Sequence, residues 1–126
     1  MKLDLTTIVV HDYDEAIDFF VNTLGFKLHK DVMIKPEKRW VVVRPTRGDA
    51  GLLLAKAINV EQKAAVGNQT GGRVSFFLDV KNFDETYEKF LFRGVRFIGT
   101  PRSENYGKVA VFLDLYGNKW DLIESI

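Results

Sequence analysis

The pattern of apolar and polar positions predicts a strand, a helix and three further strands in the first half of the chain. Residues 3–10 are rich in β-branched types, which favours a strand. Apolar side chains then recur on one helical face between Asp12 and Gly25. Asp12 stands three residues before Glu15, the spacing of a capping box, and Gly25 suits the left-handed residue that follows a helix. The further strands are predicted over residues 26–32, 40–44 and 51–57.

The same order of elements returns in the second half. A strand is predicted over residues 74–80, and a helix follows between Asn82 and Gly94. Three more strands are predicted over residues 95–99, 108–113 and 118–123. Residues 13–15 match 83–85 at a shift of 70, and residues 41–43 match 109–111 at a shift of 68. This period, with helix starts and stops in step, predicts an internal duplication.

The duplication sets the expected domain organisation. We expect one domain over residues 1–126, with a first module at about 1–58 and a second at about 73–126. The linker at about 59–72 is predicted to hold a short helix and then a glycine-rich stretch. That stretch is not a phosphate-binding loop of the Walker type, because no Gly-Lys-Ser/Thr follows it. Residues 101–107 are predicted to form a loop that leads into a strand.

Composition narrows the class of protein. The 126 residues are 46% hydrophobic and 13% aromatic, which is enough for a core and for the lining of a ligand cavity. A net charge of +1, without a basic run, argues against nucleic acid and anionic membranes as partners. The chain has no cysteine, no apolar run of spanning length and no signal-peptide pattern at its start. We therefore expect a soluble, cytoplasmic protein without disulfides.

Three local patterns sharpen this picture. Residues 12–25, with Phe26 after them, form a helix that ends in Leu-Gly-Phe. Residues 71–75 open the second half with Gly-Gly-Arg-Val-Ser, and residues 114–118 form an Asp-Leu-Tyr-Gly-Asn turn. With the doubled strand–helix–three-strand half, the whole chain resembles the vicinal oxygen chelate superfamily of glyoxalases, bleomycin-resistance proteins and extradiol dioxygenases. The resemblance implies an α+β fold in which two βαβββ modules form a curved, mostly antiparallel sheet with a concave cleft. It also implies a two-fold homodimer.

The resemblance implies a metal site as well, with two ligands from each half. The matching positions in this sequence are Leu5, Leu53, Arg73 and Asp121. Only Asp121 can coordinate a cation, because leucine is inert and arginine is a fixed cation with donors only. The two histidines, His11 and His29, are interpreted as a turn residue and a strand residue at the rim. We therefore expect no metal and no other cofactor.

A mixed, mostly apolar wall is expected in place of the metal. Arg73 and Asp121 either form an ion pair that fills the cavity, or Arg73 grips an anionic ligand that Asp121 orients. Strand alternation predicts further ligand contacts on the same faces. The predicted ligand-binding residues are Leu5, Thr7, Leu53, Arg73, Ser75, Phe77, Tyr106 and Lys119. Trp120 alternates with Asp121 and is expected to point to the opposite face, toward a helix.

Two functions follow from this wall. The first is a metal-independent binding protein for a small molecule that is anionic or aromatic. The alternative is a metal-free lyase or isomerase in which Asp121 or Glu104 is the general base and Arg73 stabilises a developing oxyanion. An ion pair with Arg73 would depress the pKa of Asp121 and weaken it as a base, so binding ranks first. A metal-dependent lyase or dioxygenase ranks last, because the ligands are missing.

Overall fold

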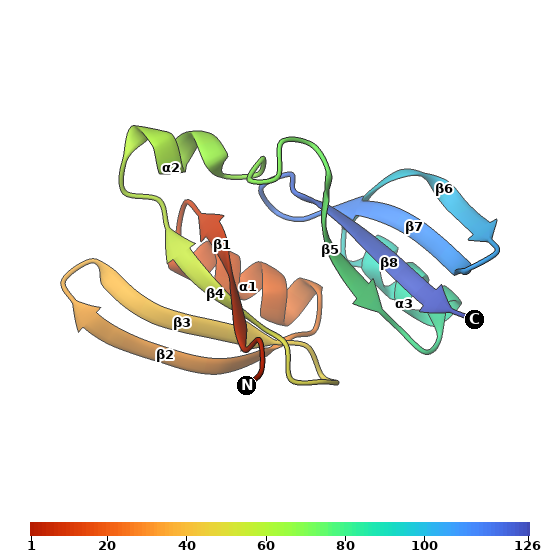
Figure 1. The fold of residues 1–126 in the computed structure, drawn as a ribbon, viewed down its shortest axis with the longest axis horizontal. Helices are drawn as coiled ribbons and strands as arrows, with labels where there is room; N and C mark the ends of the chain where they lie inside the picture. The colour runs from red at the N-terminus through yellow and green to blue at the C-terminus, as the bar shows by residue number, and fades with distance from the viewer. The chain divides into compact units, whose positions relative to one another are not determined.

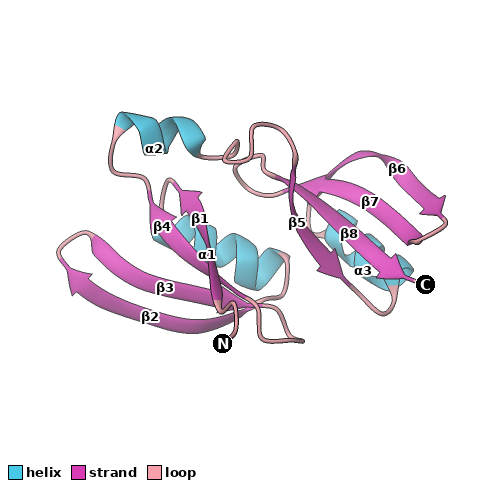
Figure 2. Cartoon of the chain, viewed as in Figure 1, coloured by secondary structure: helices cyan, strands magenta, loops and turns pink.

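Each half of the chain forms a four-stranded sheet with a helix on one face (Figures 1 and 2). The computed structural model describes residues 1–126, which divide into the units Met1–Val66 and Gly67–Ile126. In each unit one strand pair is parallel and two are antiparallel. The predicted α+β class with two βαβββ modules is confirmed, and every module has its own mixed sheet.

The first unit follows the predicted order. Its elements are β1 (Leu5–Val10), α1 (Tyr13–Asp18), η1 (Phe19–Thr23), β2 (Lys27–Lys35), β3 (Lys38–Arg44), β4 (Gly51–Lys56) and α2 (Val60–Ala65). The strands lie in the order β1-β4-β3-β2. The side chain of Asp12 accepts a hydrogen bond from the Glu15 amide at 2.8 Å, as the capping spacing predicts. The helix is not uniform, because residues 19–23 are π-helical and Leu24 N donates to Phe19 O five residues back.

The core of the first unit is mainly aliphatic. The fully buried strand residues are Ile8, Val10, Val41, Val43 and Leu54. They come from three neighbouring strands, so their burial defines one apolar face of the sheet.

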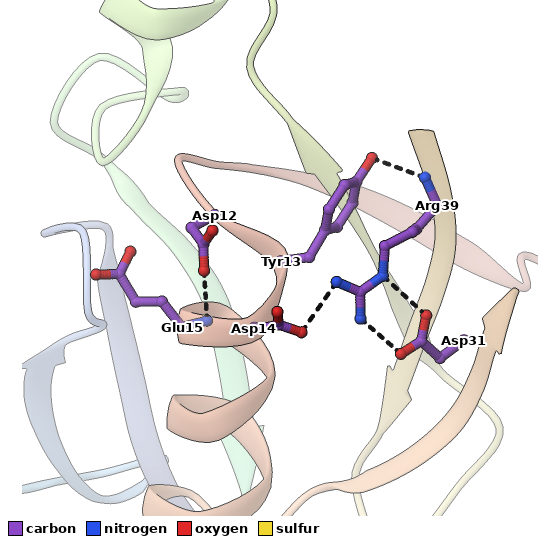
Figure 3. Close-up of polar contacts among 6 residues, drawn as sticks. All are labelled: Asp12, Tyr13, Asp14, Glu15, Asp31 and Arg39. Carbon is purple, nitrogen blue, oxygen red and sulfur yellow. Dashed lines mark hydrogen bonds and ion pairs between the residues drawn. The ribbon is translucent and has the colours of Figure 1, made fainter. Parts of the chain in front are cut away.

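A charged cluster joins the start of α1 to the hairpin of β2 and β3 (Figure 3). Arg39 donates two hydrogen bonds to Asp31, at 3.1 and 2.7 Å, and one to Asp14 at 2.9 Å. Its guanidinium also lies 5.1 Å from the centre of the Tyr13 ring. The hydrogen bond from Arg39 lowers the pKa of Asp31, and the same cluster raises the pKa of Arg39. The Arg39 side chain therefore connects two segments that are far apart in the sequence, the start of α1 and the β2–β3 hairpin.

The second unit repeats the arrangement. Its elements are β5 (Val74–Asp79), α3 (Phe83–Phe92), β6 (Arg96–Glu104), β7 (Gly107–Leu113) and β8 (Lys119–Ser125). The strands lie in the order β5-β8-β7-β6. The side chain of Asn82 caps α3 by accepting from the Glu85 amide at 3.1 Å. The predicted loop at residues 101–107 is wrong for residues 101–104, which continue β6, because a register shift between Ile98 and Arg102 lets the strand resume pairing with β7.

Aromatic rings form the core between this sheet and α3. Phe112 lies 5.5 Å from Phe90 of the helix and 5.6 Å from Trp120, measured between ring centres. Trp120 is 3% exposed and also lies 4.6 Å from Phe76. The prediction that Trp120 points toward the helix is confirmed, and the alternate residues of β5 and β8 therefore lie on the opposite face.

One buried carboxylate organises the turn between β7 and β8. Asp114 accepts hydrogen bonds from the amides of Tyr116, Gly117 and Asn118, each at 3.0 Å. It also accepts from the Asn118 amide group and from the Trp120 indole, at 3.0 Å each. The Asp-Leu-Tyr-Gly-Asn pattern is thus a turn built around its first residue. No helix in the chain is long and apolar enough to cross a membrane.

Candidate functional site

Three of the predicted ligand-binding residues surround one hollow at an end of the second sheet. The hollow has a volume of about 100 Å³. It is lined by Gly67, Asn68, Thr70, Gly72, Arg73, Ser75, Gly117, Asn118 and Lys119. These residues come from the glycine-rich stretch, the start of β5 and the turn before β8. The lining contains two cations and no acidic residue, so the hollow favours an anion.

The polar groups around the hollow are partly prearranged. The hydroxyls of Thr70 and Ser75 lie 2.9 Å apart, and Thr70 also donates to the Arg73 carbonyl at 2.8 Å. Lys119 Nζ donates to the Gly72 carbonyl at 3.1 Å, which holds the ammonium at the edge of the glycine-rich stretch. The Arg73 guanidinium is exposed and forms no ion pair or hydrogen bond within the chain. Its N–H donors are therefore available to bind an anion.

A bulge in β5 decides which residues share the hollow. Val74 pairs with Lys119 and Phe76 pairs with Trp120, so Ser75 is the extra residue on β5. The prediction that strand alternation alone places Arg73, Ser75 and Phe77 on one face therefore does not hold. In the first unit Leu5 pairs with Gly51, and the residue that pairs at the corresponding place in β5 is Val74, not Arg73. The expected equivalence of positions 5 and 73 is off by one residue.

Phe77 and Asp121 meet further along the same sheet. They are direct partners in the parallel pairing of β5 and β8. Asp121 is also paired with Val111, and Val111 with Ile98, so one row crosses all four strands on the face opposite α3. Phe77 is 67% exposed and Ile98 is 47% exposed. The row is apolar except for the one carboxylate near its middle.

The ion pair between Arg73 and Asp121 is not formed. The cation whose charge acts on Asp121 is Arg102, from the resumed part of β6. Burial raises the pKa of the Asp121 carboxyl, and the Arg102 charge offsets this only in part. The expectation of a depressed pKa is therefore wrong. Asp121 Oδ1 is buried and has no hydrogen-bond donor from the protein.

Glu104 and Tyr106 lie at the tip of the hairpin between β6 and β7. Arg102 donates to Glu104 at 3.1 Å, and its hydrogen bonds to Tyr106 and Glu104 raise its pKa. Glu104 pairs with Gly107, whereas Asp121 pairs with Val111, four residues further along β7. That separation corresponds to roughly 13 Å along the strand. The two carboxylates that were predicted as bases thus lie at different places on the sheet.

The predicted residues of the first unit form a separate group. Thr7 and Leu53 are direct partners of β1 and β4. Thr7 is exposed and Leu53 is half-buried, while the alternating residues Ile8 and Leu54 are fully buried. Leu5 is half-buried at the start of β1. This group presents an apolar surface with one hydroxyl.

The residues do not fit the metal site that the fold implies. No three His, Asp or Glu side chains come together in a way that could hold a metal ion. The direct strand partners of Asp121 are Phe77 and Val111, which offer no ligand atom.

Sequence reasoning missed Arg102, Thr70 and Asn118. Arg102 reaches the Asp121 region only because β6 resumes after a register shift, and periodicity does not report such a shift. Thr70 and Asn118 line the hollow because the linker packs beside the turn before β8. The glycine-rich stretch was the available signal for this loop, although it lacks a known phosphate motif.

Comparisons with known proteins agree with this architecture. The family model described as Glyoxalase/Bleomycin resistance protein/Dioxygenase superfamily matches residues 2–122. A protein of Shewanella frigidimarina (strain NCIMB 400), described as uncharacterized, is 49% identical over 119 residues, covering 93% of this chain and 88% of that protein. The crystal structure of UcmS2 superposes with a TM-score of 0.86 at 30% identity, covering 99% of this chain and 98% of that one. TnmS3, an antibiotic binding protein from Streptomyces sp. CB03234, has a TM-score of 0.82 at 27% identity, covering 100% and 97%.

Proposed function

Because this chain belongs to the glyoxalase/bleomycin resistance protein/dioxygenase superfamily, we propose that it is a metal-independent binding protein for a small anionic molecule, with Arg73 as the anion anchor. The observation that carries the proposal is the hollow at the start of β5. There Arg73 and Lys119 stand beside two hydroxyls, and no acidic side chain lines the wall. The similarity to TnmS3, which is an antibiotic binding protein, supports small-molecule binding as the class of function.

The chemistry of the hollow suits a carboxylate or a phosphate group. A planar guanidinium donates two parallel hydrogen bonds to such a group, and the Arg73 guanidinium is exposed. Lys119 adds a second positive charge at the rim. Binding of this kind needs a shaped surface and no general base, which fits the lack of a metal-ligand set.

Anion titration of two variants tests the anchor. Phosphate and benzoate are titrated into the wild-type protein and into Arg73→Ala, and chemical shifts of backbone amides are followed by NMR. We expect shifts at Gly71, Gly72 and Ser75 in the wild type, and affinity at least tenfold weaker in Arg73→Ala, because a charge-assisted pair is worth about 1.5–3 kcal/mol. Arg93→Ala is the control, because Arg93 is an exposed C-cap residue of α3. Equal affinity of the two arginine variants would overturn the proposal.

A metal-free enzyme is the second candidate, and one observation favours it. Burial raises the pKa of Asp121, which makes its carboxylate a better base than a paired carboxylate. The test is incubation with small keto acids in D2O, with proton NMR to follow exchange of the hydrogen next to the carbonyl. We expect exchange above the protein-free rate only if Asp121 is a base, and Asp121→Asn should abolish it while Glu104→Gln should not.

Assembly and location complete the proposal. We propose a homodimer, since edge strand β2 is exposed along its full length and presents Leu28, Val32, Met33 and Ile34 to the surface. Light scattering at micromolar concentration should give twice the mass of 14.4 kDa.

A cytoplasmic location is proposed on the lack of cysteine, and fractionation of cells tests it.

A further inference from the structure

The face of the second sheet opposite α3 places two different binding chemistries two residues apart on one strand. Lys119 and Asp121 are two residues apart on β8, and their side chains therefore lie on the same face. Lys119 lines the cationic hollow, whereas Asp121 belongs to the apolar row. Two residues along a strand span roughly 7 Å, which is close to the length of a substituted benzene ring.

Asp121 is a hydrogen-bond acceptor without a donor. Its Oδ1 atom is buried and has no partner in the chain, although the other side chains of its row leave the surrounding surface apolar. A buried acceptor that gains no hydrogen bond costs free energy, so native proteins generally satisfy such atoms. Arg102 influences the carboxyl through its charge but forms no hydrogen bond with it. A ligand that brings a hydroxyl or amine hydrogen to Oδ1 removes this cost.

Phe77 is the neighbour that fixes the shape of such a ligand. It is the direct strand partner of Asp121, and 67% of its surface is exposed. The aromatic core lies on the other face, where Phe76 packs on Trp120, so Phe77 is not needed there. An exposed ring beside a carboxylate offers a surface on which a second ring can stack while a ring substituent reaches the carboxylate.

We propose that the ligand is an aromatic acid with a hydrogen-bond donor on the far side of its ring. Its acid group binds Arg73 and Lys119 in the hollow, its ring stacks on Phe77, and its hydroxyl or amine donates to Asp121 Oδ1. This inference rests on the proposed function, because it uses the same anion anchor. It adds the class of ligand. An acid that lacks a hydrogen-bond donor leaves Asp121 Oδ1 without a hydrogen bond, and a molecule that lacks the acid group makes no ion pair with Arg73.

Three benzoates separate the parts of the proposal. The probes are 4-hydroxybenzoate, which has the donor, 4-methoxybenzoate, which replaces it with an ether, and benzoate, which lacks it. They are titrated into the full chain at pH 7.5, with dissociation constants measured by NMR. We expect 4-hydroxybenzoate to bind about tenfold more tightly than 4-methoxybenzoate, which corresponds to one hydrogen bond to a charged acceptor. Equal affinities for the two would overturn the inference and leave the anion anchor standing.

Variants of the second unit assign each contact. Asp121→Leu should bring the two affinities within about twofold of each other, since the acceptor is gone. Arg73→Ala should weaken both probes by a similar factor and preserve their ratio. Phe77→Leu should weaken both about threefold through loss of stacking, and Phe92→Leu is its control because Phe92 is a 93% exposed ring on α3. Thermal unfolding of each variant checks that it is folded.

The outcomes keep the two proposals apart. A preserved preference for the hydroxyl in Asp121→Leu would contradict the donor contact, whatever Arg73→Ala does. An unchanged affinity in Arg73→Ala would contradict the anion anchor and this inference together. Absence of binding by all three probes at millimolar concentration would also contradict both.

Discussion

The two units share a strand order but use their surfaces differently. In Met1–Val66 the ionic groups around Arg39 satisfy one another and tie α1 to a hairpin. In Gly67–Ile126 Arg73 has no partner side chain and Asp121 has a buried oxygen without a donor. Satisfied charges stabilise a fold, whereas unsatisfied charges on an open face are available to a ligand. The same scaffold thus supports a structural role in one unit and a candidate binding role in the other.

The cores differ as well. The first unit buries aliphatic strand residues, and the second stacks aromatic rings between α3 and its sheet. The rings of Phe90, Phe112 and Trp120 fill the face that α3 covers, and Phe77 and Asp121 lie on the other face of the sheet. We therefore expect the stability of the second unit to depend strongly on this aromatic core.

Phe112→Ala should have the largest effect and should test this dependence on the aromatic core. Phe112 is fully buried and contacts rings of α3, β6 and β8. We expect the free energy of unfolding to fall by about 4 kcal/mol, as for other buried aromatic truncations. Urea unfolding followed by tryptophan fluorescence measures this fall. The exposed control Phe92→Ala should change the free energy by less than about 0.5 kcal/mol.

Arg39→Ala should have the next largest effect, in the first unit. It removes a two-pronged ion pair with Asp31, a contact with Asp14 and the stacking on Tyr13, so we expect a loss of about 2 kcal/mol at pH 7. The pKa of Asp31 is lowered in the folded state, so its contribution is present above the ordinary value of 3.8 and is lost as pH falls through the lowered pKa. The difference in unfolding free energy between the wild type and the variant should therefore be smaller at pH 2 than at pH 7. Lys38→Ala, at an exposed residue of the same strand, is the control.

Asp121→Asn should stabilise the protein slightly. The raised folded-state pKa of Asp121 means that the folded state holds its proton more tightly than the unfolded state, so stability falls as pH rises from 3.8 through the raised pKa. The variant avoids this loss, and we expect a gain of at most about 1 kcal/mol at pH 7 after solvent screening. The gain should vanish at pH 3, which thermal scans at the two pH values can establish. A variant that is less stable than the wild type at pH 7 would indicate an unseen donor to Asp121 within the chain.

Metal addition should have no effect. After incubation with nickel, zinc, manganese or iron salts and desalting, elemental analysis should find far less than one ion per chain, because Leu5 and Leu53 offer no ligand atoms and Arg73 is a fixed cation. The melting temperature should also be unchanged. A stoichiometric ion would contradict metal independence, and substitution of His11, His29 or Glu104 would then locate the ligands.

The sequence predicted the elements well because their signals are local. Helix caps at Asp12 and Asn82 and the alternation around Trp120 depend on residues a few positions apart. The π-helical turn after Asp18 and the continuation of β6 past Ile98 were missed, because each depends on packing and pairing with other segments. The candidate site residues were predicted to form one wall, but the structure divides them among the hollow, the row of Phe77 and Asp121, and the first unit.

Chemical identity and periodicity, which the sequence holds by itself, determined the repeated βαβββ order and the covered face of Trp120. Tertiary structure alone decided which charges meet. One extra residue at Ser75 shifts the register of β5, so Arg73 lies beside Lys119 and the glycine-rich stretch while Phe77 lies beside Asp121. The physical reason is that strand alternation has a period of two, so one bulged residue changes the pairing of the strand before it, while Arg73 precedes β5 and is placed by the glycine-rich stretch and not by alternation.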